Sequence, residues 1–429
     1  PTKIDVSNLS GQYMGSNFNG GGHINNLLNY MLSGKPLSAS LVLNADKVNL
    51  NDWMGVSADT TATGPAAAPF AVPANLDISL DTKIDELKYD NIRIGNLSGN
   101  LKVEDEAVKL NNVSGNALDG TMKINGSYST KESKTKPAIA MSYDVNQVDI
   151  QKTFYAFNTA QKLMPIGKFL GGKLTSVLSA NGRLGDNMSV DMSTISGNGN
   201  LFLIEGFLSK FAPLDKIAST LNVKELESIS LKDVKAIFEF SNGKLLVKPF
   251  TVKIKDIEME IGGLQGFDES INYAINLKLP RALMGAKGNS FVNNLVTAVN
   301  AKGVPLNVGE TVNLKLEMGG TIKNPSLKID LKQSGETLAD QMKEQVKDFA
   351  QAKIDSAKNA VKDTLTSVKK QLMESAKDEL QKRLLGGKDT AAVNDSTPAK
   401  KPEEKTKESV KGLLDNLLKK KKKDTTNQQ

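Results

Sequence analysis

The chain has 429 residues, enough for two or three ordinary domains or for one elongated structure. Only 5% of the residues are aromatic and there is a single tryptophan, which argues against a large aromatic core. The absence of cysteine excludes disulfides, thiolate metal sites and a cysteine nucleophile. The net charge is +7, but five consecutive lysines at 419–423 supply much of that excess. The basic balance therefore does not predict nucleic-acid binding by the body of the chain.

The first residues have the pattern of a strand. Residues 1–5 lack the basic-then-apolar order of a signal peptide, and the sequence contains no apolar run of about 18 residues or more. Ile4, Val6 and Leu9 open the chain instead. We expect the sequence to be a C-terminal piece of a longer protein whose membrane anchor lies upstream.

Alternation of apolar and polar residues dominates the chain as far as residue 334, and it predicts half-buried strands. Turn signals at 241–243 (Ser-Asn-Gly) and 125–126 (Asn-Gly) favour antiparallel neighbours joined by tight loops. The predicted fold is mainly β, with short helices between strands. The clearest alternating runs are Leu76, Ile78 and Leu80; Val234, Ala236, Phe238 and Phe240; Phe250, Val252 and Ile254; Tyr273, Ile275, Leu277 and Leu279; and Val312, Leu314, Leu316 and Met318.

Two internal matches predict that strand units repeat along an extended body. A shorter match, at an offset of 100 residues, pairs 46–50 with 146–150, and a helix-permissive segment follows each copy. The longer match runs without a gap at an offset of 137 residues. It aligns Leu101, Val103, Val108, Leu110, Val113, Asp119, Met122, Ile124 and Gly126 with Phe238, Phe240, Leu245, Val247, Phe250, Asp256, Met259, Ile261 and Gly263.

Several segments interrupt the strand pattern. Residues 60–73, rich in Ala, Pro and Thr, predict a loop or linker. We divide the β region into 1–150 and 151–334, each an expected β-repeat region. Short capping helices are expected at 24–32, 153–170, 207–221 and 291–299.

From about residue 335 the period changes, and a long amphipathic helix is expected over 335–387. Thr337 and Asp340 resemble a capping box, and the glycines at 386–387 end the helix. The apolar stripe follows a 4-4-3 spacing, an eleven-residue repeat that leaves the stripe nearly straight. Its members are Val346, Ala350, Ile354, Ala357, Val361, Leu365, Val368, Leu372 and Ala376.

Residues 388–407 predict a disordered linker, and 408–429 predict a short basic amphipathic helix and tail. The C-terminal segments fit a membrane surface or a helical protein partner, and a solvated tail with intermittent helix is the plain alternative. The residues expected to make such contacts are Ile354, Val361, Leu365, Val368, Leu372, Leu413, Leu417, Lys419, Lys420 and Lys421.

No residue pattern predicts catalysis, a metal site or a cofactor. His23, the only histidine, has no nearby histidine or carboxylate cluster, so we assign it a structural or surface role. The glycines at 20–22 lack the Lys-Ser/Thr of a phosphate loop. Asp256, Glu258 and Glu260 alternate along an expected strand and fit a solvated face. An enzyme is therefore not predicted.

A long sheet with one apolar face must cover that face with helices, with a second sheet or with an apolar ligand. Periodicity alone slightly favours a closed β-sandwich in which the alternating side chains pack together. The competing fold is an elongated, curved or folded-over antiparallel sheet whose apolar groove accepts acyl chains.

Three segments resemble the C-terminal module of the AsmA family: 238–250 (FEFSNGKLLVKPF), 259–263 (MEIGG) and 271–280 (INYAINLKLP). Residues 316–327 (LEMGGTIKNPSL) resemble the closing signature of that module, and the resemblance covers most of residues 1–335. It is carried further by 196–200 (SGNGN) and 163–170 (LMPIGKFL).

The resemblance implies a Gram-negative envelope protein that is anchored in the inner membrane and projects into the periplasm. Family members are regarded as bridge-like carriers of phospholipid to the outer membrane, with no catalytic residues. The helix and basic tail after residue 335 depart from the family pattern.

We therefore expect a non-enzymatic protein that holds phospholipid or another acyl lipid and contributes to outer-membrane biogenesis. The alternative is a periplasmic scaffold that binds envelope proteins through its C-terminal helix. A carbohydrate-binding adhesin would show aromatic platforms, for which the one tryptophan and seven tyrosines give little support. The expected groove residues are Phe238, Phe240, Phe250, Val252, Ile254, Ile275, Leu277 and Leu279.

Overall fold

The structure is a computed structural model of the chain, which divides into two compact units, Pro1–Thr364 and Leu365–Gln429. All described residues belong to the first unit. The predictions for the linker at 388–407, for the tail at 408–429 and for 359–387 of the long helix fall outside them. The described residues are 3–53, 69–89, 91–186, 188–301, 309–332 and 335–358.

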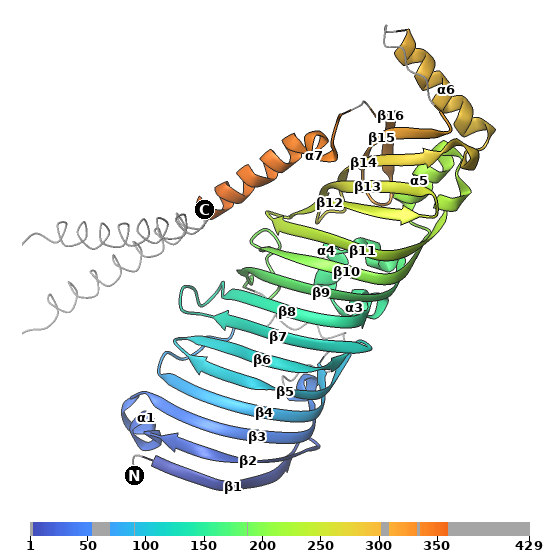
Figure 1. Cartoon of the computed structure of the whole chain (residues 1–429). Coiled ribbons are helices and arrows are strands. Elements are labelled where there is room, and N and C mark those ends of the chain that lie inside the picture. The colour runs from blue at the N-terminus through green and yellow to red at the C-terminus, as the bar shows by residue number, and fades with distance from the viewer. Residues whose placement is uncertain are drawn as a thin grey trace, which may run out of the picture. The chain divides into compact units, whose positions relative to one another are not determined.

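The strands of the described residues form one open sheet in which they follow one another in chain order (Figure 1). Neighbouring strands are antiparallel except for β3 and β4. The fold is therefore mainly β, and the alternative of two sheets closed into a sandwich is wrong for this part of the chain. The strands are β1 (Lys3–Tyr13), β2 (Ser16–Asn25), β3 (Leu37–Asn49), β4 (Leu76–Tyr89), β5 (Ile92–Glu104), β6 (Ala107–Ala117), β7 (Gly120–Ser129), β8 (Ala138–Asp149), β9 (Leu170–Arg183), β10 (Ser196–Ser209), β11 (Ser228–Ser241), β12 (Lys244–Ile254), β13 (Ile257–Gly266), β14 (Ile271–Pro280), β15 (Thr311–Gly320) and β16 (Pro325–Leu331).

The helices are short and lie between strands, as expected, but their bounds differ from the predictions. Pro165 lacks an N–H and divides the predicted helix at 153–170 into separate turns, while Pro213 marks the start of α5. The helices are α1 (Leu27–Ser33), α2 (Leu50–Trp53), α3 (Ile150–Ala156), α4 (Asn158–Leu163), η1 (Pro165–Lys168), α5 (Ala212–Leu221), η2 (Lys224–Leu226), η3 (Arg281–Leu283), α6 (Ala286–Asn300) and α7 (Leu338–Gln341).

The prediction of antiparallel neighbours fails at β3 and β4. Their register pairs Leu37 with Leu76 and Asn49 with Lys88, so the two strands run in the same direction. The chain leaves β3 through α2 and returns to the beginning of β4, which needs a crossover instead of a tight turn. Of the predicted linker, residues 60–68 lie outside the described part, and Val72 is buried and donates its N–H to Thr130 Oγ1 at 3.0 Å.

The 137-residue repeat recurs in the pairing of the strands. In the first copy Leu101 pairs with Leu110 and Leu110 with Gly126; in the second, Phe238 pairs with Val247 and Val247 with Gly263. The β-bulges recur as well, between Leu110 and Val113 in β6 and between Val247 and Phe250 in β12. The aligned sequences therefore specify the same three-stranded unit, β5–β7 and β11–β13.

The two bulges differ in local geometry. Asn112 has a φ of 51°, and its N–H is accepted by the side chain of Asn125 at 2.8 Å. The aligned residues are Pro249, which has no N–H to satisfy and cannot adopt that φ, and Gly262. The prediction of a turn at Asn125 is wrong, because this residue lies inside β7 where its side chain serves the bulge. The turn predicted at 241–243 is confirmed.

The β region is continuous across residue 150, where we placed a boundary, because β8 pairs with β9 directly.

At residue 337 the predicted capping box is confirmed, since Thr337 and Asp340 exchange side-chain to backbone hydrogen bonds at the start of α7. Helical residues continue from 343 to 358.

Replacement of Asn112 by Pro tests the difference between the bulges. Although the aligned residue is Pro249, we expect Asn112→Pro to lower the free energy of unfolding by more than about 1 kcal/mol, because proline cannot reach a positive φ. Asn112→Gly should leave it nearly unchanged. Urea unfolding followed by circular dichroism measures both, and an equal effect of the two variants would contradict the positive φ at this bulge.

Candidate functional site

One face of the sheet is apolar in nearly every strand. Residues that pair directly across two neighbouring strands point to the same face, so a row can be followed by the register. Fourteen strands contribute to one such row, and only Gln265 in it has a polar side chain. The row is Val6, Gly22, Leu41, Leu80, Leu101, Leu110, Gly126, Met141, Ala180, Gly197, Phe240, Leu245, Gln265 and Ile271.

The opposite face carries amide, hydroxyl and charged side chains that bond one another between strands. Asn100 donates to Asp81 Oδ1 at 2.8 Å and accepts from the amide of Asn111 at 3.2 Å. Glu104 lies between two lysines, Lys102 and Lys109, whose hydrogen bonds lower the pKa of its carboxyl to about 2. Because polar side chains on this face bond one another, the apolar face is the one that most needs a cover.

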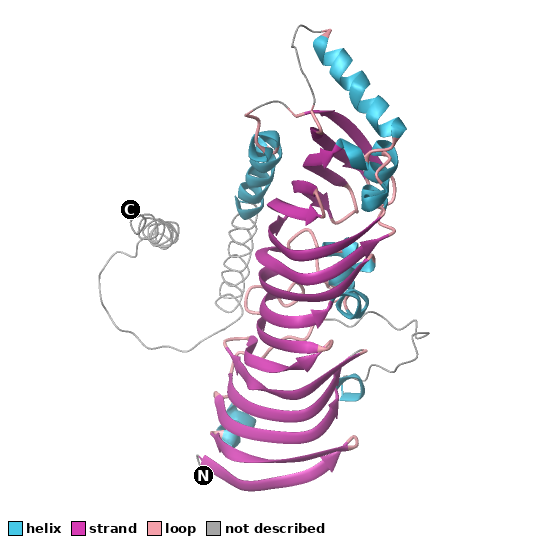
Figure 2. Cartoon of the chain, turned by 45° about the vertical axis from the view of Figure 1, so that its right-hand side comes forward, coloured by secondary structure: helices cyan, strands magenta, loops and turns pink. Residues whose placement is uncertain are grey.

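From β9 onward, helices and the β9–β10 connection cover the apolar face; the helices are visible beside these strands in Figure 2. Buried residues of α5 and α6, among them Ile217, Leu221 and Val292, pack in one large cluster with strand residues such as Leu277 and Leu314. A smaller cluster encloses Phe240 and Leu178 beneath Ile195. In this half the apolar face is the floor of a hydrophobic core.

The eight predicted groove residues all lie in this covered half. They share the apolar face, as expected, but six of them are buried in the core, and Phe238 and Phe250 are partly buried against it. Other parts of the protein cover these residues. Whether lipid reaches them stays a prediction. The six buried residues are Phe240, Val252, Ile254, Ile275, Leu277 and Leu279.

From β1 to β7 the same face is open. None of the strand residues there belongs to a buried cluster in the described part of the chain. Leu9 is 47% exposed and Leu110 is 37% exposed, and Met141, on the neighbouring β8, is 44% exposed. Strands lie about 4.8 Å apart, so seven of them span roughly 30 Å. The hydrocarbon core of a bilayer is about 30 Å thick, and one leaflet is half of that. The open section is therefore about twice as long as one leaflet is thick.

The open section has few polar anchors. Where the face continues into β8 and β9, the hydroxyl of Tyr143 lies 3.4 Å from Ser176 Oγ, which itself donates to the carbonyl of Asn200 at 2.7 Å. Burial raises the pKa of the Tyr143 hydroxyl, so the group stays neutral at physiological pH. Such a face can hold apolar matter without fixing its position along the sheet.

The sequence contains the residues of this open section, but our prediction did not select them. Leu101 and Leu110 appear in the 137-residue match, and Leu80 in an alternating run, yet every residue that we selected lies at Phe238 or beyond, in the second copy or after it. The useful signal is the spacing of the helices. Five strands, β4–β8, follow one another between α2 and α3, and the described residues between these two helices contain no further helix.

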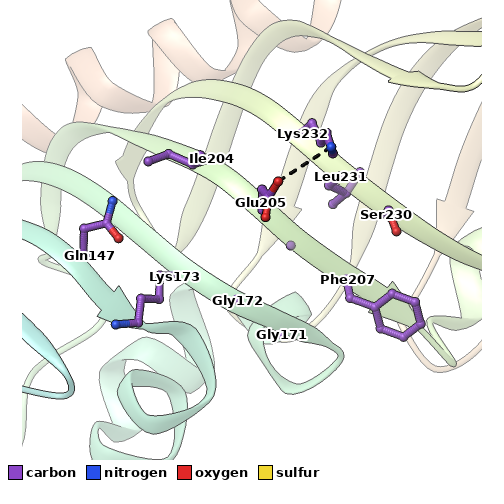
Figure 3. Close-up of a pocket in the computed structure, with 11 residues that line it drawn as sticks. Gln147, Gly171, Gly172, Lys173, Ile204, Glu205, Phe207, Ser230, Leu231 and Lys232 are labelled. Atoms are coloured by element: carbon purple, nitrogen blue, oxygen red, sulfur yellow. Dashed lines mark ion pairs between the residues drawn. The ribbon is translucent and has the colours of Figure 1, made fainter.

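Outside this face the described residues offer little chemistry. A shallow depression of about 690 Å³ crosses β8–β11 beside Gly171 and Gly172 (Figure 3). Its ion pair, between Glu205 and Lys232 at 3.6 Å, is more than 70% exposed at both side chains and is therefore weak. No cluster of potential metal ligands occurs within the described ranges. His23 lies on β2, between β1 and β3, and pairs in register with Asp5 of β1 and Ser40 of β3.

Of the C-terminal contact candidates, only Ile354 lies among the described residues, and it is 50% exposed. Val361, Leu365, Val368, Leu372, Leu413, Leu417, Lys419, Lys420 and Lys421 lie outside them. Within the described ranges, no helix has both the length and the apolar character needed to cross a bilayer.

The chain matches no known protein-family model, and no curated protein or solved structure is significantly similar to it.

The two halves of the apolar face should differ in their contribution to stability. Leu314 is fully buried, so Leu314→Ala should lower the free energy of unfolding by about 3 kcal/mol or more. Leu110→Ala, on the same face of the open half, should cost about 1 kcal/mol. Chemical denaturation of the two variants compares these values. Equal losses would contradict the division into a covered and an open half.

Proposed function

We propose that this protein holds the acyl chains of lipids on the open apolar face of β1–β7, which extends to the exposed Met141 of β8. The observation that carries the proposal is that one continuous apolar face is covered by protein in its second half and open in its first half. The register keeps Leu41, Leu80, Leu101 and Leu110 in the same row as Phe240, which is 1% exposed. Leucines in the first half of that row stay partly exposed to solvent.

Exposure of this kind favours an apolar ligand. Each methylene group removed from water contributes about 0.8 kcal/mol, so burying ten against the sheet contributes roughly 8 kcal/mol before the loss of motional freedom. Extended chains suit a face built from rows of leucine, valine and isoleucine that has few hydrogen-bonding groups. The polar opposite face keeps the other side of the sheet in water.

The resemblance to the AsmA family supports a more specific proposal. In it, the sheet is folded over an apolar groove, the protein stands in the periplasm of a Gram-negative-type cell with an anchor upstream, and its ligand is phospholipid moving between the membranes. The order of the resembling segments and the open apolar face both support this proposal. The predicted groove residues in β11–β14 then mark where the groove closes, because they are covered.

Photo-crosslinking tests which face meets lipid. A photoreactive amino acid at Met141, on the apolar face, should crosslink to lipid in cells, and mass spectrometry of the purified adduct identifies it. The matched control is Ile237, which is 54% exposed on the opposite face and should give little adduct. Equal lipid labelling at both positions would contradict a face-specific site.

A charge on the open face should release the ligand. We expect Leu110→Asp to reduce co-purifying lipid severalfold, because a carboxylate opposes apolar contacts beside Leu101 and Gly126. Val42→Asp is the control, since Val42 is 48% exposed and adjacent to Leu41 on the other face. Native mass spectrometry of gently purified protein measures the bound lipid. If lipid is persistently absent from the unaltered protein, the proposal that the protein holds lipid is refuted.

A second function, binding of envelope proteins through the C-terminal helix, is favoured by one observation. Val346 and Ile354 of the predicted stripe are 42% and 50% exposed, and the stripe's described part faces away from the sheet. If this helix binds a protein and not a membrane, Ile354→Asp should leave co-sedimentation of the chain with anionic vesicles unchanged. Loss of co-sedimentation in this variant would instead support a membrane surface.

A further inference from the structure

The helix after residue 337 packs on the polar face of the sheet, over β11–β14. Leu338, Met342 and Phe349 are buried there in a small cluster with Leu246 and Ala274. Around it, helix side chains bond polar groups of the sheet. These contacts are Gln341 to Asn276 at 2.9 Å, Gln345 to Asn272 at 3.1 Å, Lys353 to Glu239 at 3.2 Å, and Ser356 to Asn242 at 2.6 Å.

The sheet surface under this helix, which we call the seat, differs from the aligned surface of the first repeat. Leu246, Gly262 and Leu264 of the seat align at the 137-residue offset with Lys109, Asn125 and Ser127. A Cβ at position 262 would lie 2.6 Å from Met342 Sδ, so the glycine makes room for the helix. The same register of strands therefore gives a polar, water-facing surface in one copy and an apolar seat in the other.

The polar contacts around the buried cluster are weak individually. The side-chain oxygens of Gln341 and Gln345 are buried and accept no hydrogen bond from the described residues, which disfavours the docked position. Lys353 is 52% exposed, so its ion pair with Glu239 is screened by water. The helix is therefore held mainly by the small cluster of Leu338, Met342 and Phe349, and a contact that depends on so few side chains can open and close.

We propose that the seat is a binding site for an amphipathic helix, which residues 338–356 occupy reversibly and which the same helix of a second copy can take. The seat recognises two features of the helix. These are apolar side chains at positions 338, 342 and 349, and side-chain amides at positions 341 and 345. This site is independent of lipid holding on the opposite face.

A labelled peptide with the sequence of residues 335–358 tests the proposal against the full chain. Phe349→Asp in the chain should displace its own helix and raise the affinity for the peptide at least tenfold over the unaltered chain, measured by fluorescence anisotropy. Adding Leu246→Lys, which installs the residue of the first repeat, should abolish binding. Ile237→Lys, outside the seat on the same face, is the control and should leave binding unchanged.

Hydrogen exchange of the full chain gives a second measurement. Amides of 343–358 should exchange at least tenfold faster in the Leu246→Lys variant, while those of β12 and β13 keep their protection. Protection lost throughout β12 and β13 would show that the helix belongs to the sheet's core and would overturn the proposal. Equal peptide affinity of the unaltered chain and the Phe349→Asp variant would overturn it as well.

Discussion

The register of the strands is the constraint on which the rest of this structure depends. A side chain changes face whenever the pairing slips by one residue, so each bulge has to be matched if the apolar row is to continue. The bulges after Leu110 and Val247 fall at aligned positions, and Leu101 and Phe238 keep equivalent partners. The apolar row itself continues across fourteen strands, so the described sheet has one apolar face along which the covering segments change while the side chains stay apolar.

Local patterns in the sequence were enough to predict the strands, the repeat and the helix cap at Thr337. The failures concern interactions between distant residues. Asn125 and Gly126 have the composition of a turn, yet Asn125 serves the bulge at Asn112 across the ladder. The crossover between β3 and β4 has no local signal in either strand.

Prediction of the candidate site met the same limit. Alternation shows that Phe240 and Leu110 each lie on an apolar face, but it does not show that Ile195 of the β9–β10 connection packs against Phe240 while Leu110 stays partly exposed. Along the C-terminal helix, the stripe through Val346 and Ile354 stood out because its residues are aliphatic. The packed side, through Leu338, Met342 and Phe349, includes the glutamines 341 and 345, and their partners in β14 are invisible to a periodicity argument.

The crossover between β3 and β4 also bears on how the sheet forms. Every other pairing in the described sheet joins neighbours in the chain that run antiparallel, so each of those ladders contains one pair next to the connection from which the remaining pairs can form in turn. In the parallel ladder, the pairs from Leu37 and Leu76 to Asn49 and Lys88 are all equally far apart in the chain, so no pair is favoured as the first to form. The first three strands are therefore joined to the rest of the sheet by a ladder that has no local starting pair.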